Sequence, residues 1–265
     1  MTARSRAWLG RAGWLVLATA LVVSLRNVGL LDPGRLGRGT RNLATFAAGL
    51  FPPDLSTLPT LGAAMVETLQ IAFAGTAIGF AVALPLALLA CPTLFGPSLT
   101  APVKLALAFT RTVPSLFWAI VFVVAVGLGP AAGTLAVALY SLGYLGKLLY
   151  ETLDGVDPEV IEAMRSTGCG RAQLARYALL PEAANGVLAQ LLFMFEYNVR
   201  ASSIMGFVGA GGIGFYLLGY IQLLRYDLLL TGLLLTLGVV IAIDRLSAVV
   251  RRLVLVPAVS PGPTE

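Results

Sequence analysis

The sequence predicts an all-α integral membrane protein. Of its 265 residues, 58% are hydrophobic and 12% are charged, whereas a soluble domain carries about 25% charged residues. So little charge cannot cover the surface of a water-soluble fold, and disordered chains are poor in apolar residues. Two charge-free stretches, 68–103 and 112–146, are both longer than the roughly 20 apolar residues that a helix needs to cross a bilayer.

The residue types exclude several function classes. The chain has no histidine, and its two cysteines, Cys91 and Cys169, are far apart in the sequence. A histidine-dependent hydrolase or metalloenzyme is therefore excluded, and no disulfide framework or metal site is expected. The net charge of +5 is interpreted as orientation signals at the membrane edges, not as a nucleic-acid surface. The expected partner of these surfaces is the lipid bilayer.

Proline and glycine breaks divide the apolar sequence into spans. The first segment, 12–25, follows Arg4, Arg6 and Arg11 and resembles a signal peptide, but no small-residue cleavage site follows it. We expect it to be an uncleaved first span. The later spans are predicted at 65–90, 104–126, 131–150, 183–205 and 228–249. Six spans place both termini on one side of the membrane.

Basic residues indicate which side that is. With the N-terminus inside, the inner segments hold more lysine and arginine than the outer ones, which predicts cytoplasmic N- and C-termini. Four arginines of the first outer loop oppose this orientation, namely Arg26, Arg35, Arg38 and Arg41. The expected organisation is an N-terminal helix and extracytoplasmic loop over 1–64, a core over 65–255 and a C-terminal tail over 256–265. In the first helix of the core, Gly75, Gly79 and Ala83 share one face and favour close helix packing.

The stretch 151–182 is the one long polar connector on the inner side. Asp157, Pro158 and Glu159 form a helix start, and the helix is predicted to run to Thr167 and stop at Gly168. A second short helix is expected over about 171–180, ended by Pro181. The helix pair is either an ordinary connector or a docking surface for a cytoplasmic partner.

The connector carries a motif that favours docking. It reads Glu162-Ala163-Met164, three residues, Gly168, nine residues, and Ala178-Leu179-Leu180-Pro181. This resembles the EAA loop of ABC importer permeases, in which Glu162, Ala163, Gly168, Leu180 and Pro181 match the pattern. Met164 and Ala178 depart from it by small apolar changes. The resemblance implies that these residues couple the chain to an ATPase.

Other segments narrow the resemblance. They are 111–114 (RTVP), 127–130 (GLGP), 143–148 (GYLGKL), 195–200 (FEYNVR) and 206–215 (GFVGAGGIGF). Together they resemble the permease subunit of phosphonate-type ABC importers, in the binding-protein-dependent transport system inner-membrane component family. The resemblance implies a six-helix, type I, MetI-like permease bundle in a bacterial inner membrane. It also implies a permease dimer, expected as a homodimer, two cytoplasmic ATPase subunits and an extracytoplasmic phosphonate-type binding protein.

The same resemblance implies transport without catalysis by this chain. The sole Gly-Lys pair, Gly146-Lys147, is followed by leucine and cannot be a P-loop. ATP and Mg are therefore expected on the partner ATPase, with no cofactor on this chain. The anion is expected to be phosphonate, phosphite, hypophosphite or phosphate, which the sequence does not distinguish.

The glycine-rich segment needs its own interpretation. The pattern G-x-G-x-x-G is matched by Gly209, Gly211 and Gly214, with Gly212 lying within it. A dinucleotide site, however, requires a βαβ unit. This segment follows a membrane helix. We expect a tight re-entrant turn near the outer mouth, acting as an outer gate loop.

Charges within spans are costly and need partners or a function. Glu196 and Arg200 have i, i+4 spacing, so either they neutralise one another or Arg200, with Asn198, faces the pathway and contacts the anion. The planar fork of arginine suits phosphonate oxygens. Arg111 either extends to the interface or lines the inward cavity.

Two further charged sites are interpreted as structural. Glu67 is expected to be an interfacial or inter-helix partner, and Lys147 and Glu151 an i, i+4 pair. Two other functions stay open: a permease of the same superfamily for another small solute, and an ion-coupled secondary transporter. The latter would not need the connector motif, and the inverted repeats usual in such transporters are not visible here.

Overall fold

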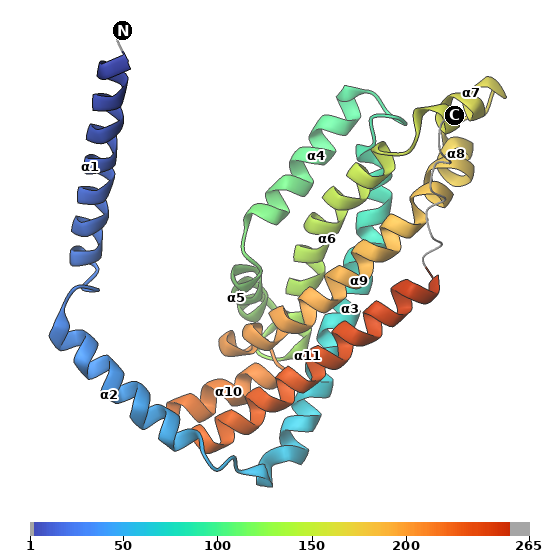
Figure 1. Ribbon diagram of the computed structural model, residues 1–265. Coiled ribbons are helices and arrows are strands. Elements are labelled where there is room, and N and C mark those ends of the chain that lie inside the picture. The colour runs from blue at the N-terminus through green and yellow to red at the C-terminus, as the bar shows by residue number, and fades with distance from the viewer. Residues whose placement is uncertain (1–2, 255–265) are drawn as a thin grey trace. The chain divides into compact units, whose positions relative to one another are not determined.

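The computed structural model describes the backbone of residues 3–254 and the side chains of residues 13–254. The predicted tail 256–265 lies outside the described residues. The chain divides into two compact units, residues 1–53 and 54–265, which are described separately (Figure 1). The described residues form helices and connecting turns without strands.

The first unit contains two helices, α1 (Ala3–Asn27) and α2 (Pro33–Leu50). The apolar part of α1, Gly13–Asn27, is shorter than a full span, so a membrane span here stays a prediction. The segment expected to be an extracytoplasmic loop contains α2. Asp32 starts it by accepting hydrogen bonds from the backbone N–H groups of Gly34 (2.9 Å) and Arg35 (3.2 Å).

The second unit holds the remaining helices: η1 (Leu55–Thr57), α3 (Leu58–Ala90), α4 (Pro97–Thr112), α5 (Ser115–Val126), α6 (Pro130–Asp154), α7 (Pro158–Ser166), α8 (Arg171–Leu174), the π-helical turn η2 (Ala175–Leu179), α9 (Leu180–Met205), η3 (Gly206–Val208), α10 (Ile213–Gln222) and α11 (Tyr226–Val254). Among the described residues, four helical segments are long and apolar enough to cross a membrane: Leu55–Ala90, Pro130–Asp154, Arg171–Val208 and Tyr226–Val254. Counting α4 and α5 as one bent span gives five.

The segment predicted as one span over 104–126 is bent. Helices α4 and α5 meet at an angle of 86°, because Pro114 disfavours a helical conformation of the preceding residue, and Val113 is extended with φ −84° and ψ 123°. The indole Nε1 of Trp118 donates to the carbonyl of Thr110 across the bend (3.2 Å). Arg111 therefore lies in the last turn of α4, exposed beside the bend, and not within a continuous span.

The predicted helix end at Pro181 is wrong. The helix continues from Arg171 to Val208 as one segment. Pro181 cannot donate a hydrogen bond to the carbonyl four residues earlier, and the π-helical turn Ala175–Leu179 lies at that place, with the N–H of Leu180 donating to the carbonyl of Ala175. The widened turn accommodates the proline without breaking the helix.

Packing of α3 against α6 confirms the small-residue face. A side chain at Gly75 would meet Val137, and one at Gly79 would lie 2.7 Å from the carbonyl of Ala138. Ala83 is fully buried on the same face. These small residues let the two helices approach closely and form the scaffold on which α9 and α4 pack.

Candidate functional site

Helix α7 forms as its sequence predicts. The Asp157 carboxylate accepts a hydrogen bond from the N–H of Glu159 (2.9 Å), and Pro158 occupies the first turn. The helix ends at Ser166, and Gly168 takes a left-handed conformation with φ +78°. A residue with a side chain would be strained there, which explains the glycine.

The predicted coupling residues lie on two parts of this connector. Glu162 and Ala163 are exposed on α7 and Gly168 is exposed just after it, whereas Ile161 on the same helix is buried. Leu180 and Pro181 lie at the start of α9. Leu180 packs on the same hydrophobic cluster as Met164 of α7. Both parts of the motif therefore rest on one hydrophobic cluster. Glu162, Ala163, Gly168 and Pro181 are exposed.

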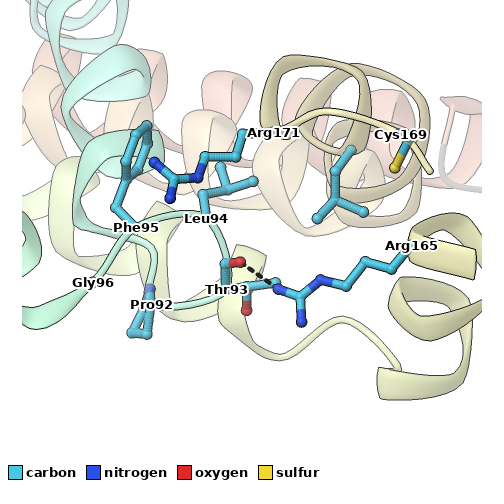
Figure 2. Close-up of a pocket in the computed structure, with 9 residues that line it drawn as sticks. Pro92, Thr93, Leu94, Phe95, Gly96, Arg165, Cys169 and Arg171 are labelled. Carbon is cyan, nitrogen blue, oxygen red and sulfur yellow. Dashed lines mark hydrogen bonds between the residues drawn. The ribbon is translucent and has the colours of Figure 1, made fainter.

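The loop between α3 and α4 contacts Arg165 and Arg171 of this connector (Figure 2). The Arg165 guanidinium donates to the backbone carbonyl of Thr93 (2.8 Å), and the Thr93 hydroxyl donates to the Asp154 carboxylate at the end of α6 (3.1 Å). Arg171 lies over the ring of Phe95, 5.5 Å from its centroid. We call these contacts the clasp; they tie the ends of α3 and α6 to α7 and α8.

A hollow of about 310 Å³ lies within the clasp, lined by Pro92–Gly96, Arg165, Cys169, Arg171 and Leu174. Thr93, Phe95, Asp154 and Arg165 were not predicted as site residues from the sequence. Pro92 signals the break after α3, but no local pattern indicates which partner that loop meets.

The intramembrane charges form inter-helix pairs, so the predicted Glu196–Arg200 pair is wrong. Glu196 accepts a hydrogen bond from Arg251, and Arg200 Nη2 lies 3.3 Å from Asp244 Oδ1. Both partners are on α11, so Glu196 and Arg200 of α9 each face an opposite charge on that helix. Partners on a neighbouring helix are not visible in the spacing of one helix.

Asn198 points away from Arg200 into the helix core. Its side chain is fully buried, and its amide Nδ2 donates to the hydroxyls of Thr76 on α3 and Ser141 on α6, both at 2.8 Å. The residue therefore joins α3, α6 and α9. The structure does not bring Asn198 and Arg200 together on one surface.

The glycine-rich segment is a tight turn. Gly209, Gly211 and Gly212 have φ values of +83°, +83° and +76°, which favour glycine. The N–H of Gly212 donates to the Glu67 carboxylate (2.8 Å), so Glu67 of α3 holds the backbone of this turn. Gly214 lies in the first turn of α10 against the carbonyl of Ser203, where a side chain would clash. Because residues 3–254 contain no strand, this turn has no βαβ unit around it.

Two further polar contacts complete the scaffold. Lys147 and Glu151 form the predicted pair, with 3.1 Å between Nζ and Oε1. Arg225 bridges Asp54 (3.4 Å) and Asp227 (2.8 Å), which fastens the start of α11 to the start of the second unit. Hydrogen bonds from Ser56 hold the pKa of Asp54 below its usual value.

Comparison with known families decides the class. Residues 75–256 match the family described as binding-protein-dependent transport system inner membrane component. The chain belongs to this family. Its core is therefore an inner-membrane permease, and the coupling role of the 162–181 motif stays a prediction.

Curated relatives agree with this assignment. The permease is 35% identical to the phosphite transport system permease protein PtxC of Stutzerimonas stutzeri, over 92% of this chain and 90% of that protein. It is 38% identical to the phosphate-import permease protein PhnE of Mycolicibacterium smegmatis, over 76% of this chain and 38% of that protein. These relatives are named as transport permeases, so the chain is a transport subunit and not itself an enzyme.

Solved structures give the same fold. The permease superposes on a chain of the MetNI methionine ABC transporter with a TM-score of 0.69 and 26% identity, covering 77% of this chain and 100% of that one. A bacterial alginate ABC transporter matches with a TM-score of 0.63 at 15% identity, which bears on the fold alone. The predicted MetI-like permease bundle is confirmed.

Proposed function

We propose that this permease moves a phosphorus oxyanion, namely phosphonate, phosphite, hypophosphite or phosphate, in an ATP-driven importer. The observation that carries the proposal is the 35% identity, over nine-tenths of both chains, to a permease named for phosphite transport. The exposed guanidinium of Arg200 supports it, since arginine binds such oxyanions with parallel hydrogen bonds.

The proposed assembly contains a second copy of this chain, two cytoplasmic ATPase subunits and an extracytoplasmic binding protein for the anion. ATP and Mg bind to the ATPase subunits, and this chain holds no cofactor. The ATPases dock on α7 and its neighbours, where the coupling residues are Glu162, Ala163, Gly168, Leu180 and Pro181. Leu180 is half-buried and supports this surface, and the other four residues are exposed. Both termini of the chain lie in the cytoplasm.

The proposed pathway runs along α9. Arg200 and Arg111, both exposed in the single chain, meet the anion, while Glu196 and Asn198 are buried behind this surface and hold α9 in place. The turn with Gly209, Gly211, Gly212 and Gly214 forms the outer gate. Closure of the ATPases moves α7, the clasp passes this motion to α3 and α6, and the pathway opens alternately to each side.

Uptake by the reconstituted complex tests the proposal. The permease, its ATPase and its binding protein are placed in proteoliposomes with internal ATP, and phosphite, phosphate and methylphosphonate are offered outside. We expect uptake of at least one that is blocked by vanadate and survives collapse of ion gradients. Vanadate-insensitive uptake that follows an ion gradient would favour a secondary transporter. Uptake of methionine or carnitine instead would assign another solute.

A further inference from the structure

The Arg200–Asp244 pair differs from its neighbour one turn away. In the Glu196–Arg251 pair, the Glu196 side chain is only 10% exposed, whereas the Arg200 and Asp244 side chains are 55% and 45% exposed. The first pair is a link between α9 and α11 in which Glu196 is buried and Arg251 is 35% exposed. The second is open to a small ion arriving from outside the helix bundle.

Arg200 is only partly satisfied. A guanidinium has five N–H donors, yet within the described residues Arg200 makes a single hydrogen bond, to Asp244 Oδ1 at 3.3 Å. A carboxylate can accept two parallel bonds from arginine, and here one is formed. The remaining donors are available to a second anion.

A hollow lies beside Arg200 and offers more donors. It measures about 240 Å³ and is lined by Ser115, Leu116, Tyr197, Arg200, Ala201, Ile204 and Met205. Sites for drug-sized ligands occupy about 300–1,000 Å³, so this one suits a ligand of a few atoms. The Tyr197 hydroxyl accepts from Tyr140 (3.3 Å), which leaves its own proton free to donate. The Ser115 hydroxyl has no hydrogen-bond partner in the described part of the chain.

We propose that Asp244 is a tethered counter-ion that exchanges with the transported oxyanion at Arg200. When the site is empty, the carboxylate neutralises a charge that is costly within a spanning segment. When the oxyanion arrives, its oxygens accept hydrogen bonds from the Arg200 guanidinium and from the hydroxyls of Tyr197 and Ser115. Asp244 is then displaced. Asp244 then competes for Arg200 and promotes release, which a pathway requires because its binding must be weak enough to let the ion leave.

The inference rests on the proposed function, and equilibrium dialysis of phosphite against the permease–ATPase complex in nanodiscs tests it. Asp244→Asn removes the competitor while keeping the shape, so phosphite should bind at least about fivefold more tightly, which is the lower end of typical coupling between sites. Asp244→Glu keeps the charge and should bind as the wild type does. Arg200→Gln should abolish the gain when combined with Asp244→Asn.

A matched control is Glu151→Gln, which breaks another partly exposed pair away from the hollow and should leave phosphite binding unchanged. Exposed pairs contribute little to stability, and elution of intact complex checks that each variant assembles. If wild type transports phosphite and Asp244→Asn binds it no more tightly, the counter-ion role is overturned and the proposed function stands. If neither complex binds or transports phosphite, phosphate or methylphosphonate, both are overturned.

Discussion

The Asn198 amide connects three helices through side-chain atoms alone. It donates to the Thr76 hydroxyl on α3 and to the Ser141 hydroxyl on α6. The Thr76 hydroxyl in turn donates to the backbone carbonyl of Ala72 (2.6 Å). Such groups depend on one another because a buried donor or acceptor left without a partner is costly. Removing the amide should therefore loosen the contact between all three helices.

Asn198→Ala should lower the free energy of unfolding by about 1–3 kcal/mol, the cost of unsatisfied buried groups. Thermal unfolding of the purified permease measures the change. Gln190→Ala is the control, because Gln190 is only partly buried and makes one bond, to Thr152 (2.6 Å), so its effect should be smaller. An unchanged melting temperature together with lost transport would instead make Asn198 a contact of the anion.

At the scale of single elements, two prolines have opposite effects on their helices. Pro114 bends the segment predicted as one span over 104–126, so that α4 and α5 meet at 86°. Pro181 was predicted to end a helix that in fact continues. The local effect of proline is the same at both places, since it removes a donor and crowds the preceding turn. Whether a helix bends or widens depends on packing partners, which the sequence of one segment does not contain.

Elements defined by local signals were predicted well. The caps of α7, the glycine at 168 and the small-residue face of α3 depend on neighbours in sequence or on one helix turn. The charged pairs were not predicted correctly. The i, i+4 spacing made Glu196 and Arg200 candidates for each other, whereas their partners lie about fifty residues later on α11. The clasp was missed for the same reason, since Thr93 and Arg165 are 72 residues apart.

Gly168→Asp should reduce coupling between the ATPase and the permease. The backbone at Gly168 has φ +78° with open space around it, so the cost is conformational, about 1–2 kcal/mol, and the turn after α7 should shift. Transport should fall and the ATPase should detach or hydrolyse ATP without uptake, while the permease stays inserted. Uptake and ATP hydrolysis in proteoliposomes measure both effects.

Gly170→Ala provides the matched control for that turn. Gly170 has φ −76°, which any residue adopts, and the nearest atom to an added side chain is 3.8 Å away. This variant should transport normally. Full transport and normal assembly by Gly168→Asp would contradict the role of this turn in coupling.

At the scale of the whole molecule, the two native cysteines report the orientation in the membrane. Cys169 is half-buried in the clasp, and Cys91 is fully buried. With cytoplasmic termini, the connector 151–182 faces the cytoplasm. A membrane-impermeant maleimide should therefore label the permease in inside-out vesicles and leave intact cells unlabelled.

Cys169→Ser should remove the label, because Cys91 is out of reach of the reagent. Labelling of Cys169 in intact cells would reverse the orientation and would move the coupling surface to the wrong side for a cytoplasmic ATPase. Four arginines that follow the first predicted span oppose the orientation by charge count and make this measurement informative; they are Arg26, Arg35, Arg38 and Arg41.

The unbroken helix from Arg171 to Val208 has a mechanical meaning. At 1.5 Å per residue, its 38 residues extend for about 57 Å, well beyond the roughly 30 Å of a bilayer core. One end lies in the clasp, and the other leads directly into the glycine turn held by Glu67. The helix can thus act as a lever, because a tilt imposed at its connector end reaches the far end without crossing a loop. Its π-helical turn at 175–179 lies close to the connector end.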